Sequence, residues 1–305
     1  MIVTTASGLQ QDAQGDGTDG ARLRVAVVGA GMMAEAIIRQ LIVRDVVAPY
    51  DIVVSAPRLE RRVYLTETYG LTAVAENAET VRGASVVVLC VKPPIIPKVL
   101  LELREALDAH QLIISIAASV SVAALGRLSC HSSIVRSMPN TPARIGEGLT
   151  IWVASPTVTT RQIAHTRAIF AAIGNEMEVD DESFLDMAAA ISGAGPSYLY
   201  LVMEALMEAG VQLGLPRRMS EDMVRQTMLG AARLAQETGQ HPAVLKNAVT
   251  SPGGITAAAL YQLEKGGLRS NLADAVVAAY DQAITLGQNG ERRRRRKRAV
   301  YLRTS

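Results

Sequence analysis

The first half of the chain alternates short apolar runs with longer segments of helical periodicity. The runs are rich in Val, Ile and Leu, which is typical of strands buried on both faces. Strands that alternate with helices predict a parallel sheet covered by helices on both sides. The predicted strands are 23–28, 51–55, 85–91, 112–117, 133–137, 149–153 and 176–179, and the predicted helices among them are 32–43, 58–69, 97–107 and 161–172.

The strand pattern stops near residue 180, and only helical patterns follow. Several of these helices are apolar on nearly all sides, and such helices need partners on more than one side. A domain this small cannot easily supply them, so we predict a homodimer that shares the helical core. An ordinary compact bundle is the alternative. The predicted helices are 197–213, 220–238, 242–249, 256–265 and 268–286.

These patterns divide the chain of 305 residues into two domains and two tails. We predict an α/β domain with a doubly wound parallel sheet over residues 22–180, and an all-α dimerisation and substrate domain over 181–290. Residues 1–21 are polar, and 291–305 contain an Arg-rich run. Both tails are predicted to be disordered.

Charge and composition exclude several classes of function. The net charge is +2, but the tail 291–305 carries eight positive charges and one negative, which leaves residues 1–290 at −5. A mildly acidic body argues against nucleic-acid binding, and we predict that the tail is solvated. No apolar run is long enough to span a membrane. Cys90 and Cys130 lack metal-binding spacing, so we predict no metal site and a reducing cytoplasm.

A dinucleotide fingerprint follows the first predicted strand. The segment VAVVGAGMMAEA places Gly29, Gly31 and Ala34 in a GxGxxA pattern between a strand and a helix. The first glycine permits a tight turn, and the second lets a pyrophosphate approach the backbone. The alanine allows the helix to pack closely on the strand. This context predicts a dinucleotide-binding domain of Rossmann type.

The end of the second strand indicates which dinucleotide is bound. A carboxylate there would accept hydrogen bonds from the ribose, whereas an arginine would favour a 2′-phosphate. Asp51 begins the strand, and the strand ends with Ser55 followed by Arg58. We therefore predict NADPH, with NADH as the alternative, and assign the phosphate to Ser55 and Arg58. The alternative for Arg58 is a solvated residue in the first turn of a helix.

The segment 250–256, TSPGGIT, is the candidate substrate site. Its adjacent glycines let the backbone approach a ligand, and the following residues predict a helix. Free N–H groups and the hydroxyl of Ser251 would meet at the positive end of the helix dipole, where a small carboxylate binds well. A helix start without a ligand is the alternative.

Several segments together resemble the pyrroline-5-carboxylate reductase family. The resemblance implies a Rossmann domain, a helical dimerisation domain and a larger ring built of dimers. It also implies reduction of L-Δ1-pyrroline-5-carboxylate to L-proline, the last step of proline biosynthesis, by NAD(P)H. The matching segments are 27–36, 90–94, 114–119, 135–143, 190–200 and 245–256.

The same resemblance implies roles for individual residues. We take Thr256 as the catalytic candidate, because its hydroxyl could hydrogen-bond the ring nitrogen and orient or relay a proton. The chain departs from the family pattern at Ser119, Ala189 and Ala194, where Gly, Thr and Ser are usual. The implied cofactor contacts are Gly29, Gly31, Met32, Met33, Asn77, Val91, Lys92, Pro93 and Ala117, with Met138, Pro139 and Asn140 near the reacting ring; the implied substrate contacts are Ser251, Gly253, Gly254 and Thr256.

Two other functions compete with a reductase of this kind. A β-hydroxyacid dehydrogenase needs a base, commonly a lysine on the first helix of the helical domain, and the predicted helix 197–213 has none. A non-catalytic dinucleotide sensor would bind the cofactor without turnover. The intact SPGGIT segment argues against the sensor, and site residues rather than fold separate the three functions.

Overall fold

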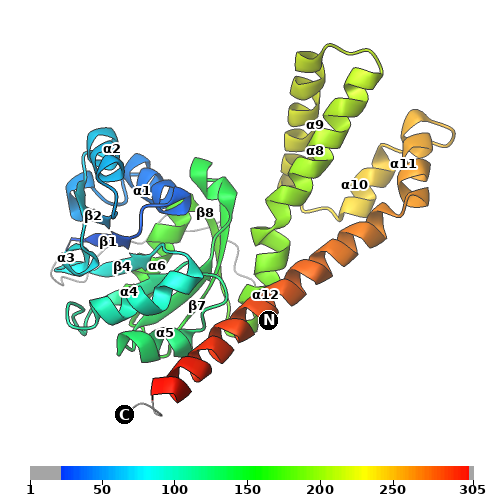
Figure 1. Cartoon of the computed structure of the whole chain (residues 1–305). Helices are drawn as coiled ribbons and strands as arrows, with labels where there is room; N and C mark the ends of the chain where they lie inside the picture. Colours follow the sequence, from blue (N-terminus) through cyan, green and yellow to red (C-terminus); the bar gives the residue numbers. More distant parts are fainter. Residues whose placement is uncertain (1–21, 302–305) are drawn as a thin grey trace.

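The computed structural model describes the backbone of residues 22–301 and the side chains of residues 22–287. The predicted disordered segment 1–21 lies outside the described residues. An eight-stranded sheet in the order β3-β2-β1-β4-β5-β6-β7-β8 forms the first part of the chain (Figure 1). Its strands are β1 (Val25–Val28), β2 (Ile52–Ser55), β3 (Thr72–Val74), β4 (Val86–Leu89), β5 (Leu112–Ser115), β6 (Ile134–Met138), β7 (Gly148–Ala154) and β8 (Gly174–Glu178).

Helices cover both faces of this sheet, and the core is two apolar layers. Alternate residues of β1 point to opposite layers: Val25 and Val27 pack with one layer, Ala26 and Val28 with the other. This two-sided burial explains why the strands are short continuous apolar runs. The helical segments between and beside the strands are α1 (Met32–Val43), η1 (Pro49–Asp51), α2 (Leu59–Tyr69), α3 (Asn77–Val81), η2 (Pro93–Ile95), α4 (Ile96–Leu103), α5 (Val122–Ser129), η3 (Thr141–Ile145) and α6 (Thr160–Ile173).

The sheet is wholly parallel only from β3 to β6. Strand β7 pairs antiparallel with β6, and β8 pairs parallel with β7. The short link between β6 and β7 contains only η3, whereas a parallel return needs a crossover of about a dozen residues or more. The predicted Rossmann-type α/β fold with a doubly wound parallel sheet is confirmed, and the antiparallel pairing of β7 with β6 at this edge is an exception that the sequence did not indicate.

A second part of the chain projects from the sheet as a helical arm (Figure 1). We define the arm as α8 (Gly195–Gln212), α9 (Arg217–Thr238), α10 (Pro242–Ala248) and α11 (Ile255–Lys265). Helix α7 (Ser183–Ala188) and a π-helical turn, η4 (Ala189–Gly193), lead into it. Helix α12 (Leu268–Tyr301) returns from the arm to the sheet domain. Helix α12 runs to Tyr301, residues 302–305 lie outside the described residues, and the disorder expected for the basic tail 291–305 stays a prediction.

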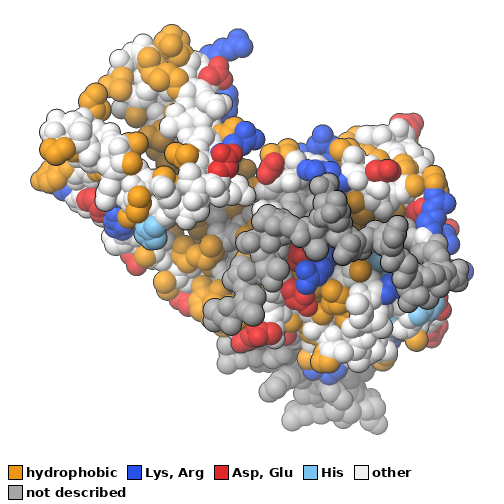
Figure 2. All heavy atoms as spheres, turned by 180° about the vertical axis from the view of Figure 1, so that it is seen from behind, with side chains coloured by type: hydrophobic (Ala, Val, Ile, Leu, Met, Phe, Trp, Pro, Cys, Tyr) orange, Lys and Arg blue, Asp and Glu red, His pale blue; other side chains and the backbone are white. Residues whose placement is uncertain are grey.

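Within one chain the arm has almost no fully buried side chain. Among the described side chains, α8, α10 and α11 contain no buried residue, and α9 contains only Ser220. Apolar side chains are therefore displayed over the arm (Figure 2). They include Leu199, Tyr200, Leu201, Leu206, Leu213, Met219, Met223, Leu229, Leu234, Ile255, Tyr261 and Leu263. Exposed apolar area of this extent indicates an interaction surface. No helix in the part of the chain that the structure describes is long and apolar enough to cross a bilayer.

Candidate active site

The turn between β1 and α1 requires glycine at its first position. Gly29 has φ +95°, and a Cβ added there would lie 2.7 Å from Val91 Cγ1 and 3.1 Å from the Cys90 carbonyl oxygen. Both the left-handed backbone and the close approach of the segment after β4 exclude a side chain. The turn is thus held directly against the carboxyl end of the neighbouring strand.

Gly31 has a different role from Gly29. Its missing side chain leaves open space beside the start of α1, whereas Gly29 is required by a tight turn. It is the N-cap of α1 with an ordinary φ of −78°, and no side chain caps the helix there. A Cβ added at Gly31 would have no neighbouring atom within 4 Å. Uncapped N–H groups beside open space, at the positive end of a helix, fit the pyrophosphate of a dinucleotide.

The two residues predicted to hold a 2′-phosphate are placed differently. Ser55 is 2% exposed, and its hydroxyl accepts a 3.2 Å hydrogen bond from the Gly29 N–H, so it supports the glycine turn. Arg58 is the exposed N-cap of α2, and within the described residues its side chain has no hydrogen bond or ion pair. Asp51 lies before β2 and pairs with Arg22. Arg58 is therefore the one of the two predicted phosphate ligands whose side chain is available.

A cluster of polar side chains on α1 and α2 holds the glycine turn in place. Nothing in the sequence pattern indicated it. Arg61 Nε donates a 3.0 Å hydrogen bond to the carbonyl oxygen of Ala30, between the two glycines, and its guanidinium pairs with Glu35. The hydroxyls of Tyr64 and Tyr69 each donate to Glu35 Oε1 at 2.9 Å. The cluster fixes the orientation of the Ala30 peptide.

The same hydrogen bonds determine the protonation states of Glu35 and Tyr69. Burial raises the pKa of the Glu35 carboxyl, but the hydrogen bonds from Arg61, Tyr64 and Tyr69 outweigh it and bring the pKa below its usual value. Burial, followed by the bond to Glu35, raises the pKa of Tyr69 to about 12. At neutral pH the cluster therefore holds an ionised Glu35 carboxylate and a neutral Tyr69.

Most remaining residues of the predicted cofactor set follow parallel strands and therefore meet at one edge of the sheet. Lys92 is exposed, whereas Ala117 is 3% exposed. Asn77, at the first position of α3, donates a 2.8 Å hydrogen bond to Glu102 Oε2. The structure brings Met32, Met33, Val91, Lys92, Pro93 and Ala117 to this edge, around the carboxyl ends of β1, β4 and β5.

The loop after β6 is tied to the helical region. Asn140 Nδ2 donates a 3.1 Å hydrogen bond to the Ser192 carbonyl oxygen in η4. Its Oδ1 accepts a 2.9 Å bond from the Leu149 N–H. A Cβ at Gly193 would lie 2.8 Å from Met138 Cε, so η4 approaches this loop closely. The π-helical turn therefore lies directly beside the predicted cofactor edge.

The predicted substrate loop forms the start of α11. Gly253 has φ +69°, and Gly254 is the N-cap of α11. The Gly254 N–H donates a 3.0 Å bond to the Ser251 carbonyl oxygen, so in this conformation it is engaged inside the loop. Thr256 lies half-buried in the first turn, where N–H groups have no acceptor within the helix.

The loop lies on the arm, apart from the sheet (Figure 1). Within one chain the structure therefore does not bring Ser251, Gly253, Gly254 and Thr256 to the predicted cofactor edge.

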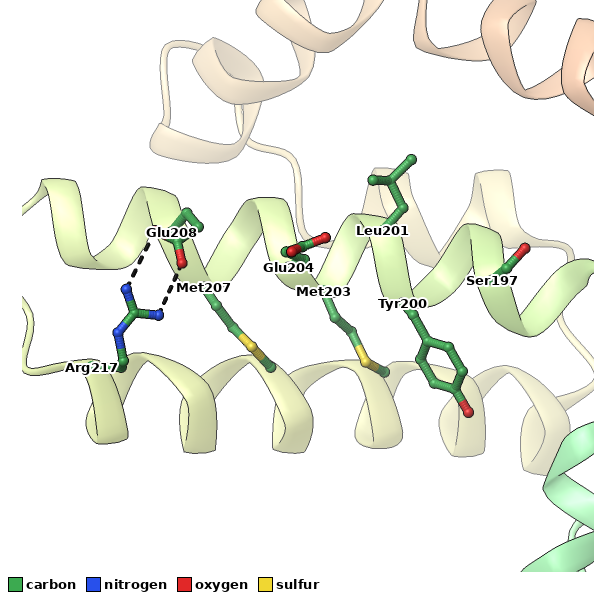
Figure 3. Close-up of a pocket in the computed structure, with 8 residues that line it drawn as sticks. All are labelled: Ser197, Tyr200, Leu201, Met203, Glu204, Met207, Glu208 and Arg217. Atoms are coloured by element: carbon green, nitrogen blue, oxygen red, sulfur yellow. Dashed lines mark hydrogen bonds and ion pairs between the residues drawn. The ribbon is translucent and has the colours of Figure 1, made fainter.

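A groove lies on the arm between α8 and the start of α9 (Figure 3). Met203, Met207 and Tyr200 line it, and the ion pair between Arg217 and Glu208, 2.9 Å, closes one end. A hydrogen bond from Arg217 lowers the pKa of Glu208. These side chains lack a nucleophile–base pair. Among the described residues, no group of three or more His, Cys, Asp or Glu could hold a metal ion.

Three features define a dinucleotide-dependent oxidoreductase of Rossmann type: the glycine turn, the open space at Gly31 for a pyrophosphate (the pyrophosphate seat), and the helical second part of the chain. Two family models match: NADP oxidoreductase, coenzyme F420-dependent, over residues 24–119, and pyrroline-5-carboxylate reductase dimerisation over residues 182–286. The pyrroline-5-carboxylate reductase of Synechocystis sp. is 41% identical over 87% of this chain and 99% of its own. That of Pseudomonas aeruginosa is 37% identical over 87% and 97%. The chain belongs to the pyrroline-5-carboxylate reductase family.

Solved structures agree with this assignment. The pyrroline-5-carboxylate reductase of Coxiella burnetii is 37% identical, with a TM-score of 0.80 over 87% of this chain and 98% of its own. The pyrroline carboxylate reductase of Plasmodium falciparum, solved with NADP bound, is 31% identical, with a TM-score of 0.79 over 87% and 98%. The match extends over both the sheet domain and the helical part.

Proposed function

We propose that this protein reduces L-Δ1-pyrroline-5-carboxylate to L-proline, the last step of proline biosynthesis, with NADPH as hydride donor and NADH as the alternative. The observation that carries the proposal is the identity of 41% to a reductase of this name over 87% of the chain. The glycine turn and the SPGGIT loop lie in the ranges 24–119 and 182–286 that the two family models match. A sensor without turnover would not need that loop. A β-hydroxyacid dehydrogenase is disfavoured because α8 has no lysine.

The cofactor would lie along the carboxyl edge of the sheet. The uncapped start of α1 and the open space at Gly31 receive the pyrophosphate, and Arg58 meets the 2′-phosphate of NADPH. Ala117 closes the nicotinamide side. When bound, the reduced nicotinamide supplies the hydride. No residue of this edge is placed as a nucleophile. The chain itself would therefore orient the cofactor and the substrate and complement their charges.

The SPGGIT loop would bind the substrate. The Ser251 hydroxyl and the N–H groups at the start of α11, with Gly253 and Gly254 giving close backbone approach, hold the carboxylate. Thr256 then lies where its hydroxyl can bond the ring nitrogen, which gains electron density as the imine carbon is reduced. A hydroxyl is a weak acid, so Thr256 orients or relays the proton rather than releasing its own.

A second copy of the chain would complete the site. The loop and the cofactor edge lie apart in one chain (Figure 1), and the arm leaves its apolar surface uncovered. Pairing of two arms covers that surface and can bring each loop to the other copy's sheet domain. We therefore propose a homodimer through the helical domain, and a ring of such dimers as the larger assembly. We also place the protein in the cytoplasm, because Cys90 and Cys130 are both free thiols.

Replacing Thr256 by alanine tests the reaction and the site together. Turnover of pyrroline-5-carboxylate, followed by NADPH oxidation, should fall about 10-fold or more in kcat/KM, since a lost transition-state hydrogen bond of roughly 1.4 kcal/mol has this effect. Thr256→Ser keeps the hydroxyl and should remain within about threefold of the wild type. Wild-type turnover with an unaffected alanine variant would remove Thr256 from the mechanism. NADPH binding without any turnover would favour the sensor.

Mixing two impaired variants tests whether the site is shared. Gly31→Glu places a negative charge at the pyrophosphate seat, and Thr256→Ala impairs the substrate loop. In a mixed dimer with a shared site, the intact edge of one chain meets the intact loop of the other. Equal co-expression should thus restore about a quarter of wild-type activity, because half of the dimers are mixed and one of their two sites is whole. Activity no higher than that of the separate variants would place the site within one chain.

A further inference from the structure

Ser119, in the loop after β5, has a backbone conformation that is unfavourable for a residue with a side chain. Its φ is +62°, in the left-handed region that glycine adopts freely. Such a conformation persists in a non-glycine residue only where the surroundings impose it. The residue lies two positions after Ala117, at the predicted nicotinamide side of the sheet edge.

A hydrogen bond to α12 accompanies this conformation. The Ser119 hydroxyl donates to the Ala283 carbonyl oxygen of α12 at 3.1 Å. One turn further along α12, Gly287 passes so close that a Cβ there would lie 3.7 Å from Ser119 Cβ. The two residues joined by the bond are 164 positions apart, so the contact connects the sheet domain with the helix that returns from the arm.

The neighbouring loop is tied to the helical region in the same way. Asn140, after β6, donates to the Ser192 carbonyl oxygen in η4 at 3.1 Å. Strands β5 and β6 are adjacent and parallel, so their two loops emerge side by side at the edge that would receive the nicotinamide. Each loop donates one hydrogen bond to a carbonyl oxygen of a helical element outside the sheet domain.

We propose that Ser119 is a positioning residue: its hydrogen bond to Ala283 holds the loop containing Ala117 against the nicotinamide in the geometry that hydride transfer needs. The proposal rests on the proposed reductase function. A small displacement of this loop changes the distance and angle between donor and acceptor carbons without removing a binding contact. The bond should therefore affect kcat more than the affinity for NADPH.

Two substitutions separate the hydrogen bond from the backbone conformation. Ser119→Ala keeps the Cβ and loses the hydroxyl, whereas Ser119→Gly loses both the hydroxyl and the steric cost of positive φ. Thr285→Ala is the matched control, because the Thr285 hydroxyl bonds to the Asp281 carbonyl within α12 and does not reach the loop. Both Ser119 variants should lower kcat about fivefold or more, with KM for NADPH changed less than about twofold. The control should match the wild type.

Hydrogen exchange of the cofactor-free protein supplies a readout that does not depend on turnover. Loss of the bond should speed exchange of the amides in 116–120 about 10-fold in both Ser119 variants, and not in Thr285→Ala. Wild-type kcat and unchanged exchange in Ser119→Ala would overturn the positioning role, as would a fully active Ser119→Gly. A fall in thermal stability alone, with kcat unchanged, would also overturn it. If the wild type itself shows no turnover, the proposed function fails, and the positioning role fails with it.

Discussion

Replacing Gly29 by alanine is expected to weaken NADPH binding about 30-fold or more. An L-residue in the left-handed region costs about 1–2 kcal/mol, and the new methyl group would lie 2.7 Å from Val91 Cγ1 and 3.1 Å from the Cys90 carbonyl oxygen. The turn must open to relieve this contact, and a total cost of ~2 kcal/mol or more corresponds to the stated change. Titration of the protein with NADPH, followed by the fluorescence of the reduced nicotinamide, measures this affinity.

Gly31→Ala is the control that separates fold from binding. Its φ is −78° and its Cβ would meet no atom within 4 Å, so the cofactor-free protein should melt as the wild type does. NADPH affinity should nevertheless fall, because the methyl group occupies the proposed pyrophosphate seat. Gly29→Ala should instead lower both thermal stability and affinity. Wild-type affinity in either variant would show that the cofactor does not lie across this turn.

The second large effect is expected from Arg136→Met, which should lower the free energy of unfolding by about 2–3 kcal/mol. The Arg136 side chain is 6% exposed and bonds Glu182 at 2.8 Å and Asp186 at 2.7 Å. It thereby joins β6 to the segment that leads into the arm. Removing it leaves two carboxylates facing each other without a cation. They are 31% and 27% exposed, so water relieves part of the cost, and the effect lies below that for a fully buried pair.

Urea unfolding measures this change, and a neutralised variant checks its cause. When Glu182→Gln and Asp186→Asn are added to Arg136→Met, no unpaired charge remains. The amide oxygen that Glu182→Gln introduces could still accept the bond that Glu182 receives from the Val122 N–H, 2.8 Å in this structure. The triple variant should therefore be more stable than Arg136→Met alone. Equal instability would indicate that the packing of the arginine stem, rather than its charge, holds β6 and α7 together.

The features predicted best from the sequence are those with a strong local signal. Helix α1 follows the glycine fingerprint and has the predicted bounds, and the helices of the arm lie close to their predicted ranges. The shortest elements were missed. Strand β3 has three residues and no buried side chain, so it lacks the apolar run by which the other strands were found. Helix α5 was also missed; it contains Gly126, a poor helix former.

The residues of the candidate site also fall into those with a local sequence signal and those without one. The turn residues Gly29 and Gly31 follow from a contiguous motif, because their roles depend on backbone geometry alone. The role of Arg61 depends on a bond to Ala30 across 31 positions, which only the packing of α2 beside the glycine turn creates. Nothing in the local sequence distinguishes it from the neighbouring Arg62. Long-range hydrogen bonds of this kind carry no periodic signal.

In the homodimer proposed above, the uncovered arm would make folding of this protein a bimolecular process. A newly synthesised chain can complete its sheet domain alone, but its helical hairpins keep large apolar side chains in water until a second copy arrives. By mass action, stability then depends on protein concentration. In the interval before pairing, the lone chain presents the kind of surface that chaperones retain and proteases cleave. In such a dimer the rate at which two copies meet would set how much of each new chain escapes degradation.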